Sequence, residues 1–189
     1  MGHSEKLQTT IFAEPGPRNT HATLDLAAIR GEALGIEQMV VATSTGKTAL
    51  EAAERFDGRI IAVTLSAGHW ETYCPPSREI VAELEKRRVR VLTCTHSLLG
   101  GIDAAVSAIG GLAAAEIIAR TYYTISQGTK VAVECALMAA DAGLLEMDRE
   151  VISIAGTGGG ADTALVLKPA FSNTFFDDLR IREIIAMPR

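Results

Sequence analysis

Cysteine, excess positive charge and long apolar segments are all scarce in this sequence. The three cysteines, Cys74, Cys94 and Cys135, are odd in number, lie far apart and form no Cys-x-x-Cys pair. This spacing argues against a disulfide framework and against a zinc site, and it fits a reducing compartment. We therefore expect a protein without a bound metal.

Charge and hydropathy exclude further classes of protein. A net charge of −5 offers no basic surface to nucleic acid or to an anionic membrane, so any phosphate site must be local. The longest apolar stretch, Ala104 to Ala115, contains two glycines and is too short to span a bilayer. The N-terminus is polar and lacks the apolar core of a signal peptide. We expect a cytoplasmic protein.

The overall composition is typical of a folded globular protein, with 48% hydrophobic and 22% charged residues. A length of 189 residues suits one domain with a full core. No internal repeat or low-complexity linker divides the sequence, so we expect a single α/β domain over residues 1–189.

Apolar runs alternate with amphipathic segments in the first half of the chain, which indicates a doubly wound parallel sheet. The predicted strands of this half are residues 36–42, 59–65 and 89–93. Between them, one predicted helix follows Thr48 and ends near Gly58, and another begins after Ser77. The second half is predicted to contain helices 112–127 and 130–142 broken at Gly128, strands 151–155 and 163–167, and a final strand or short helix at 181–187.

The loop after the first predicted strand is the most informative segment of the sequence. It reads Thr43-Ser44-Thr45-Gly46-Lys47-Thr48 and leads into a helix. Free amide groups and the helix dipole at such a terminus favour an anion, and Lys47 adds a positive charge. The loop therefore predicts a binding site for a single phosphate. The alternative is a helix capped by hydroxyl groups, with Lys47 in solvent.

This loop is not a nucleotide-binding P-loop. That motif needs a glycine five residues before the glycine of its Gly-Lys pair, where this sequence has Val41. Without that glycine the loop cannot form the wide nest that holds a diphosphate. No acidic residue at the end of a second apolar strand stands out as a Mg²⁺ ligand.

A glycine-rich segment, Gly156 to Asp162, joins the two strands predicted at 151–155 and 163–167. It imitates a dinucleotide fingerprint, but the residues after it favour a strand rather than the long helix which that motif requires. Its glycines allow the backbone to approach a ligand closely, and a plain hairpin turn is the alternative. The residues that could contact a ligand here are Thr157, Gly158, Gly159, Gly160, Asp162 and Thr163.

Several side chains are expected at the same carboxyl edge of the sheet, where open α/β sheets bind their ligands. His69 and Trp70 follow the second predicted strand and His96 follows the third. Glu134 and Asp141 lie seven residues apart on one face of an apolar helix, and Lys130 precedes Glu134 by one turn. These acids indicate either a ligand contact or a structural pairing, as buried acids are usually paired. We take His69, Trp70, His96 and Glu134 as pocket candidates.

The chain resembles the C-terminal α/β domain of pyruvate kinase, here standing alone. Two blocks carry the resemblance: MVVATSTGKTALEAAERFDGRIIAVT (39–64) and VISIAGTGGGADTALVL (151–167), in the order of that domain. The resemblance implies a three-layer α/β sandwich around a mostly parallel five-stranded sheet with one antiparallel edge strand. The N-terminal helix and the tail after Pro169 are additions, similar to those of small archaeal and bacterial proteins built on this domain.

The resemblance also implies a ligand and excludes one activity. The family's domain holds a phosphate of an allosteric sugar phosphate in the loop that matches Thr43, Ser44, Thr45, Gly46, Lys47 and Thr48, helped by the glycine-rich turn. The catalytic barrel is absent, so pyruvate kinase activity is not expected. We predict a binding or regulatory protein for a sugar phosphate or a mononucleotide such as FMN, whose ring Trp70 could stack on.

Two expectations remain open at this point. The alternative function is an enzyme that acts on a phosphorylated small molecule with a histidine and a carboxylate as its acid–base pair, but no catalytic constellation stands out. The second concerns assembly: Phe171, Phe175 and Phe176 in the tail could cover a neighbouring subunit or the chain's own core. The family precedent favours a homo-oligomer.

Overall fold

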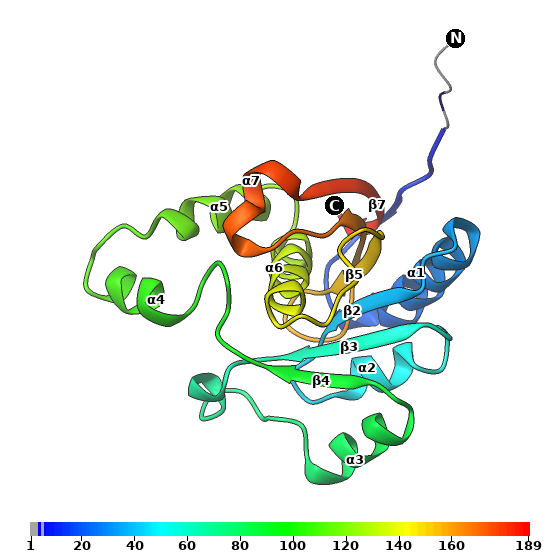
Figure 1. The fold of residues 1–189 in the computed structure, drawn as a ribbon, viewed down its shortest axis with the longest axis horizontal. Helices are drawn as coiled ribbons and strands as arrows, with labels where there is room; N and C mark the ends of the chain where they lie inside the picture. Colours follow the sequence, from blue (N-terminus) through cyan, green and yellow to red (C-terminus); the bar gives the residue numbers. More distant parts are fainter. Residues whose placement is uncertain (1–3, 5) are drawn as a thin grey trace.

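In the computed structural model, the described part of the chain, residue 4 and residues 6–189, forms a twisted seven-stranded sheet covered by helices on both faces (Figure 1). The strand order is β1-β7-β6-β5-β2-β3-β4. The strands are β1 (Thr10–Phe12), β2 (Gln38–Ala42), β3 (Arg59–Thr64), β4 (Arg90–Thr93), β5 (Val151–Ala155), β6 (Thr163–Lys168) and β7 (Arg180–Pro188).

The five predicted strands, β2 to β6, form one continuous part of this sheet. Strands β5, β2, β3 and β4 pair in parallel, and β6 pairs antiparallel with β5. The predicted mostly parallel sheet with an antiparallel strand at its border is therefore confirmed. The sheet nevertheless has seven strands instead of five, because β7 pairs antiparallel with β6 and β1 pairs in parallel with β7. The tail after Pro169 thus extends the sheet. Of the two structures predicted for residues 181–187, a strand or a short helix, the strand is the one observed.

Helices cover both faces of the sheet and make the predicted three-layer sandwich. One face buries α1 (Thr20–Leu34), α2 (Lys47–Ala52) and α3 (Arg78–Lys86). The other buries α6 (Gln127–Asp141), with α5 (Ala114–Tyr123) packed on it. Alternate residues of each central strand enter the two cores, so the strands read as continuous apolar runs. Neither these helices nor the others of the described chain combine the length and apolarity needed to cross a bilayer.

Two helix predictions are corrected. Helix α2 ends at Ala52 rather than near Gly58, and turns fill the remaining residues. Gly128 does not break a helix, because Ser126 caps α6 by accepting a hydrogen bond from the Thr129 amide at 2.9 Å. Glycine is needed at this position of the helix, because a Cβ would lie 2.2 Å from Thr163 Oγ1.

A helical arm precedes α6. It contains α4 (Gly101–Ala108) as well as α5, and α4 contributes no buried side chain. Figure 1 shows α4 at the left of the view, to one side of the sheet and of α6. Near this arm, in the tail, α7 (Phe175–Asp178) places Phe175 edge-on to Tyr122 of α5. Phe175 thus covers the chain's own core, whereas Phe171 and Phe176 are exposed. The homo-oligomer stays a prediction.

Candidate functional site

The fold places a topological switch point between β2 and β5. From β2 the chain crosses over to β3 and then β4 on one side, and it returns to add β5 on the other side of β2. Connections that leave neighbouring parallel strands in opposite directions open a crevice at their carboxyl ends. The segment 43–48 follows β2 and the segment 156–162 follows β5, so the two loops singled out in the sequence flank this crevice.

The first loop has a fixed shape. The Thr43 hydroxyl accepts a hydrogen bond from the Gly46 amide at 3.0 Å. Gly46 has a left-handed φ of 87°, and a Cβ there would lie 2.4 Å from Ile80 Cγ2 of α3. Only glycine combines this backbone angle with so close an approach to a neighbouring helix. The loop is therefore packed against α3 at Gly46.

Exposure divides the six predicted phosphate-binding residues into two groups. Thr43, Gly46 and Thr48 are buried and shape the loop, whereas Ser44 and Thr45 are half-buried and Lys47 is exposed. The Leu50 amide is the first to bond back along the helix, to the Gly46 carbonyl at 3.0 Å, so the helix itself leaves the amides before it unbonded. Because α2 has only six residues, its dipole is weak. Amides, hydroxyls and Lys47 would have to hold an anion.

The glycine-rich turn divides in the same way. Gly158 and Gly159 are exposed, both have positive φ, and no other part of the chain lies within 4 Å of where their Cβ atoms would be. Gly160 instead packs on the start of α1, where a Cβ would lie 2.3 Å from Thr20 Oγ1. Gly158 and Gly159 thus present bare backbone at the crevice, and Gly160 fixes the turn against the body of the protein.

Asp162 and Thr163 are fully buried and bonded within the chain. The Asp162 carboxylate accepts hydrogen bonds from the amides of Gly16 at 2.9 Å and Thr157 at 3.1 Å, and from the Thr163 hydroxyl at 2.9 Å. The Thr163 hydroxyl also lies 3.2 Å from the Ser126 hydroxyl. Both side chains therefore hold the turn in place and offer no free atom to a ligand in this structure, whereas Thr157 remains half-exposed.

The histidines after β3 and β4 come together as the parallel topology predicts. The rings of His69 and His96 are stacked, with centroids 5.6 Å apart and planes 6° from parallel. His69 Nδ1 lies 2.9 Å from the Ser66 hydroxyl. Burial lowers the pKa of His96, and Lys130 and His69 act in the same direction while the Glu134 carboxylate opposes them. Trp70 is 40% exposed and donates from its ring nitrogen to the Leu65 carbonyl at 3.1 Å.

Glu134 is buried beside these histidines, and its oxygens are occupied. One oxygen accepts from the amides of Leu98 and Leu99 at 2.8 and 2.9 Å, and the other pairs with the buried Lys130 ammonium. The structure thus selects the structural interpretation of Glu134. Asp141 likewise accepts from the Ser172 amide at 2.9 Å and holds the tail. No group of three or more histidine, cysteine, aspartate or glutamate side chains arranged for a metal ion occurs among residues 4 and 6–189.

Two cavities, of about 270 and 420 Å³, lie at the opposite, amino edge of the sheet. These cavities were not anticipated from the sequence, because no arginine was considered as a candidate site residue. A usable signal was present: Arg59 and Arg90 begin neighbouring parallel strands, and the starts of such strands meet at one edge. The arginines that line the cavities are Arg59, Arg87, Arg88 and Arg90.

Comparison with known proteins identifies one family and a set of distant structures. The family model described as "Pyruvate kinase, alpha/beta domain" matches residues 21–167. A pyruvate kinase structure from Cryptosporidium parvum aligns with 80% of this chain and 23% of its own, at 15% identity and a TM-score of 0.43. A structure of the Cryptosporidium parvum enzyme in complex with ADP aligns with 88% of this chain and 23% of its own, at 15% identity and a TM-score of 0.39. The chain spans about a quarter of the length of these pyruvate kinases.

Proposed function

Because the chain belongs to the pyruvate kinase alpha/beta domain family, we propose that it binds a small phosphorylated ligand at the carboxyl edge of its sheet. The observation that carries the proposal is the position of two loops. Segments 43–48 and 156–162 follow adjacent parallel strands on the two sides of the topological switch point. Sugar phosphates and mononucleotides such as FMN are the ligand classes proposed.

Each part of the proposed site has a separate role. Lys47 is exposed and supplies the positive charge for a phosphate, while the half-buried Ser44 and Thr45 supply hydroxyl donors. Gly158 and Gly159 leave room for the rest of the ligand to lie against bare backbone. Trp70 lies after β3, along the same edge, with enough exposed surface to stack on a flat ring.

A thermal-shift screen against sugar phosphates, mononucleotides and FMN tests the proposal. A ligand present at a hundred times its Kd stabilises the native state by about 2.7 kcal/mol, which raises the melting temperature measurably. Lys47→Ala should weaken binding about tenfold, because it removes a charged hydrogen-bond donor. Lys86→Ala is the matched control, since it removes the same charge from an exposed position at the end of α3, near the opposite, amino edge of the sheet.

Two results would count against the site. If no phosphorylated compound raises the melting temperature, the binding proposal fails. If a ligand binds Lys47→Ala and the natural sequence equally well, the ligand lies elsewhere. Yellow colour in the purified protein would be direct support for a bound flavin.

An enzyme acting on the same class of ligand is the second candidate, and the stacked pair of His69 and His96 is the observation in its favour. Glu134 is poorly suited to be the carboxylate partner, because its oxygens already accept from two amides and from Lys130. An enzyme would turn over the bound compound. Loss of turnover in His96→Ala, with binding retained, would favour this candidate over a binding protein.

A further inference from the structure

The amino edge of the sheet holds two adjoining cavities that share Arg88. The larger, of about 420 Å³, lies between the ends of α2 and α3 and the start of β3, and its wall includes Arg59, Arg87 and Arg88. The smaller, of about 270 Å³, lies along the exposed edge strand β4 and its wall includes Glu85, Arg88 and Arg90. The larger cavity falls within the size range of small-molecule sites.

The walls of these cavities are positively charged although the chain as a whole is negative. Four arginines and two acidic residues, Asp57 and Glu85, give the two walls a net charge of +2 in a chain of net charge −5. Arg59 forms an ion pair with Glu146, and Arg87 forms ion pairs with Glu54 and Glu83. Of these glutamates Glu54 is exposed, and Glu83 and Glu146 are half-buried. Within the part of the chain that the structure describes, the side chains of Arg88 and Arg90 make no ion pair or hydrogen bond.

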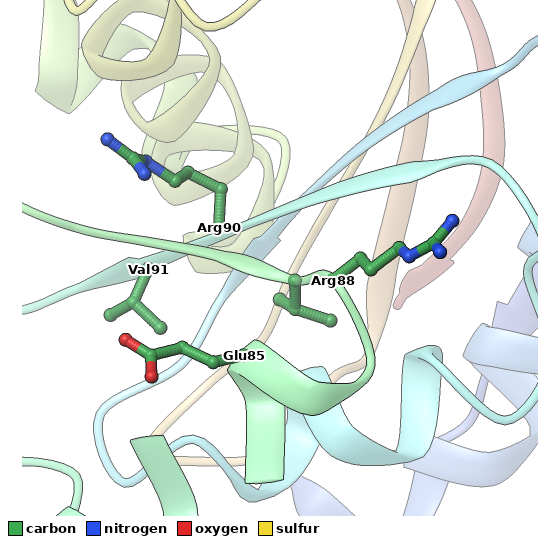
Figure 2. Close-up of a pocket in the computed structure, with 5 residues that line it drawn as sticks. Glu85, Arg88, Arg90 and Val91 are labelled. Atoms are coloured by element: carbon green, nitrogen blue, oxygen red, sulfur yellow. The ribbon is translucent and has the colours of Figure 1, made fainter. Parts of the chain in front are cut away.

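Figure 2 shows how these side chains lie around the smaller cavity. Arg88 and Arg90 reach away from one another, and the Glu85 carboxylate is directed away from Arg88. The Arg88 guanidinium is therefore not neutralised by the acid nearest to it in sequence. It remains available to the larger cavity, whose wall it shares with Arg59 and Arg87.

The backbone at Arg88 is the unusual feature. Helix α3 ends in a Schellman motif, in which the amides of Arg88 and Val89 bond to the carbonyls of Glu85 and Leu84, each at 2.9 Å. This motif requires a left-handed residue, and Arg88 has a φ of 59°. Arg88 is the only residue other than glycine with positive φ among residues 4 and 6–189.

The same motif ends three other helices, and each of those uses glycine. The left-handed residues that follow α1, α4 and α6 are Gly35, Gly110 and Gly143. None of the three has any other part of the chain within 4 Å of a Cβ position, so backbone angle and not space accounts for the glycine. The protein is therefore less stable with arginine at the left-handed position that ends α3 than it would be with glycine there. A favourable charge at the helix end does not require it, because Lys86 and Arg87 already provide one.

We propose that the larger cavity is a second anion site, in which Arg59, Arg87 and Arg88 bind a small polyanion bearing phosphate groups. Guanidinium groups bind phosphate oxygens through paired hydrogen bonds, and three of them on one wall suit a ligand with more than one phosphate charge. The site lies at the edge opposite to Lys47, so the two sites would fill independently.

Calorimetric titration with inorganic pyrophosphate tests this site through Arg88→Gly. Glycine adopts a left-handed φ without strain, so the variant should fold and melt at a temperature no lower than that of the natural sequence. Its affinity for pyrophosphate should fall about tenfold or more, because a charged donor is lost. A variant that gains stability and loses the ligand is the result expected if Arg88 is kept for binding.

Lys86→Ala is the matched control, because Lys86 lies in the same helix end, is exposed, and lines neither cavity. It should retain pyrophosphate binding. Equal losses in both variants would mean attraction by diffuse charge, and would overturn the proposal. So would the absence of pyrophosphate binding by the natural sequence, or unchanged affinity in Arg88→Gly.

Lys47→Ala separates this site from the carboxyl edge. Binding that survives Lys47→Ala but not Arg88→Gly places pyrophosphate at the amino edge. The reverse pattern would overturn the present inference while supporting the function proposed above.

Discussion

The two edges of the sheet hold their polar side chains in contrasting ways. At the carboxyl edge Asp162 and Glu134 are buried and bonded to backbone amides, and Lys130 is buried against Glu134. At the amino edge Arg88 and Arg90 are exposed and have no bonded partner among the described residues. At the carboxyl edge these buried polar groups bond to the protein's own loops. At the amino edge the guanidinium groups of Arg88 and Arg90 are available to a ligand.

This difference distinguishes residues that hold loops in place from residues that would contact a ligand. A buried, bonded group at the carboxyl edge holds a loop in place and should affect stability when it is removed. The exposed groups should affect binding without stabilising the fold: Lys47→Ala should leave stability nearly unchanged, and Arg88→Gly should raise it slightly by removing a left-handed arginine. Residues of the same type occur at both edges, so substitutions can be matched.

The largest expected effect comes from Glu134→Ala, compared with Glu85→Ala. Removing Glu134 leaves the buried Lys130 ammonium without its counter-charge and two amides without an acceptor, which should cost about 3–5 kcal/mol of unfolding free energy. Glu85 is exposed, and its removal should change stability by less than about 0.5 kcal/mol. Urea denaturation measures both. Similar losses of unfolding free energy in Glu134→Ala and Glu85→Ala would contradict the difference between the two edges.

An intermediate effect is expected for Asp162→Ala, with Asp57→Ala as its match at the amino edge. Asp162 accepts three hydrogen bonds from buried or half-buried donors, so its loss should cost about 2–3 kcal/mol. Hydrogen exchange at the amides of Gly16 and Thr157 should accelerate at the same time. Asp57 is exposed and should be nearly neutral. Slow exchange at those amides in Asp162→Ala would contradict the positioning role.

The smallest effect concerns pH and His96. Burial is the main cause that lowers the pKa of His96 below its ordinary value of 6.5, so the folded state favours the neutral ring. The unfolded chain therefore binds a proton first as the pH falls, and stability declines between 6.5 and the lower pKa of the folded state. Titration by NMR measures that pKa directly. His96→Asn should remove this part of the pH dependence, and a pKa at or above 6.5 would refute it.

Much of the fold could be predicted from the sequence because it is encoded locally. The apolar runs around Val40, Ile61 and Ile152 mark strands buried on both faces, and the loops between them mark the crevice. Lys130 could be proposed as a possible partner for Glu134 because one helical turn separates them, although the sequence left a ligand contact open. Helix α2 was predicted too long, because its residues after Ala52 have helical propensity but the chain must turn to enter β3.

The remaining features depend on contacts between distant segments. Strand β1 has three residues and no pattern of its own, and its partner β7 comes from the other end of the sequence. The arginine-lined cavities need Arg59 of β3 beside Arg87 and Arg88, which only the parallel pairing brings together. The left-handed backbone at Arg88 has no sequence signal, because glycine is the residue that normally marks it.

The pairing of β1 with β7 also bears on the order in which the molecule opens. Thr10 lies beside Ala186, and the ladder between the two strands is only three residues long. The rest of the sheet can stay folded when β1 detaches, so only this short ladder and its neighbouring contacts oppose the opening. In native-state hydrogen exchange we expect β1 to detach first, as a small unit that opens while β2, β3 and β5 stay protected until global unfolding.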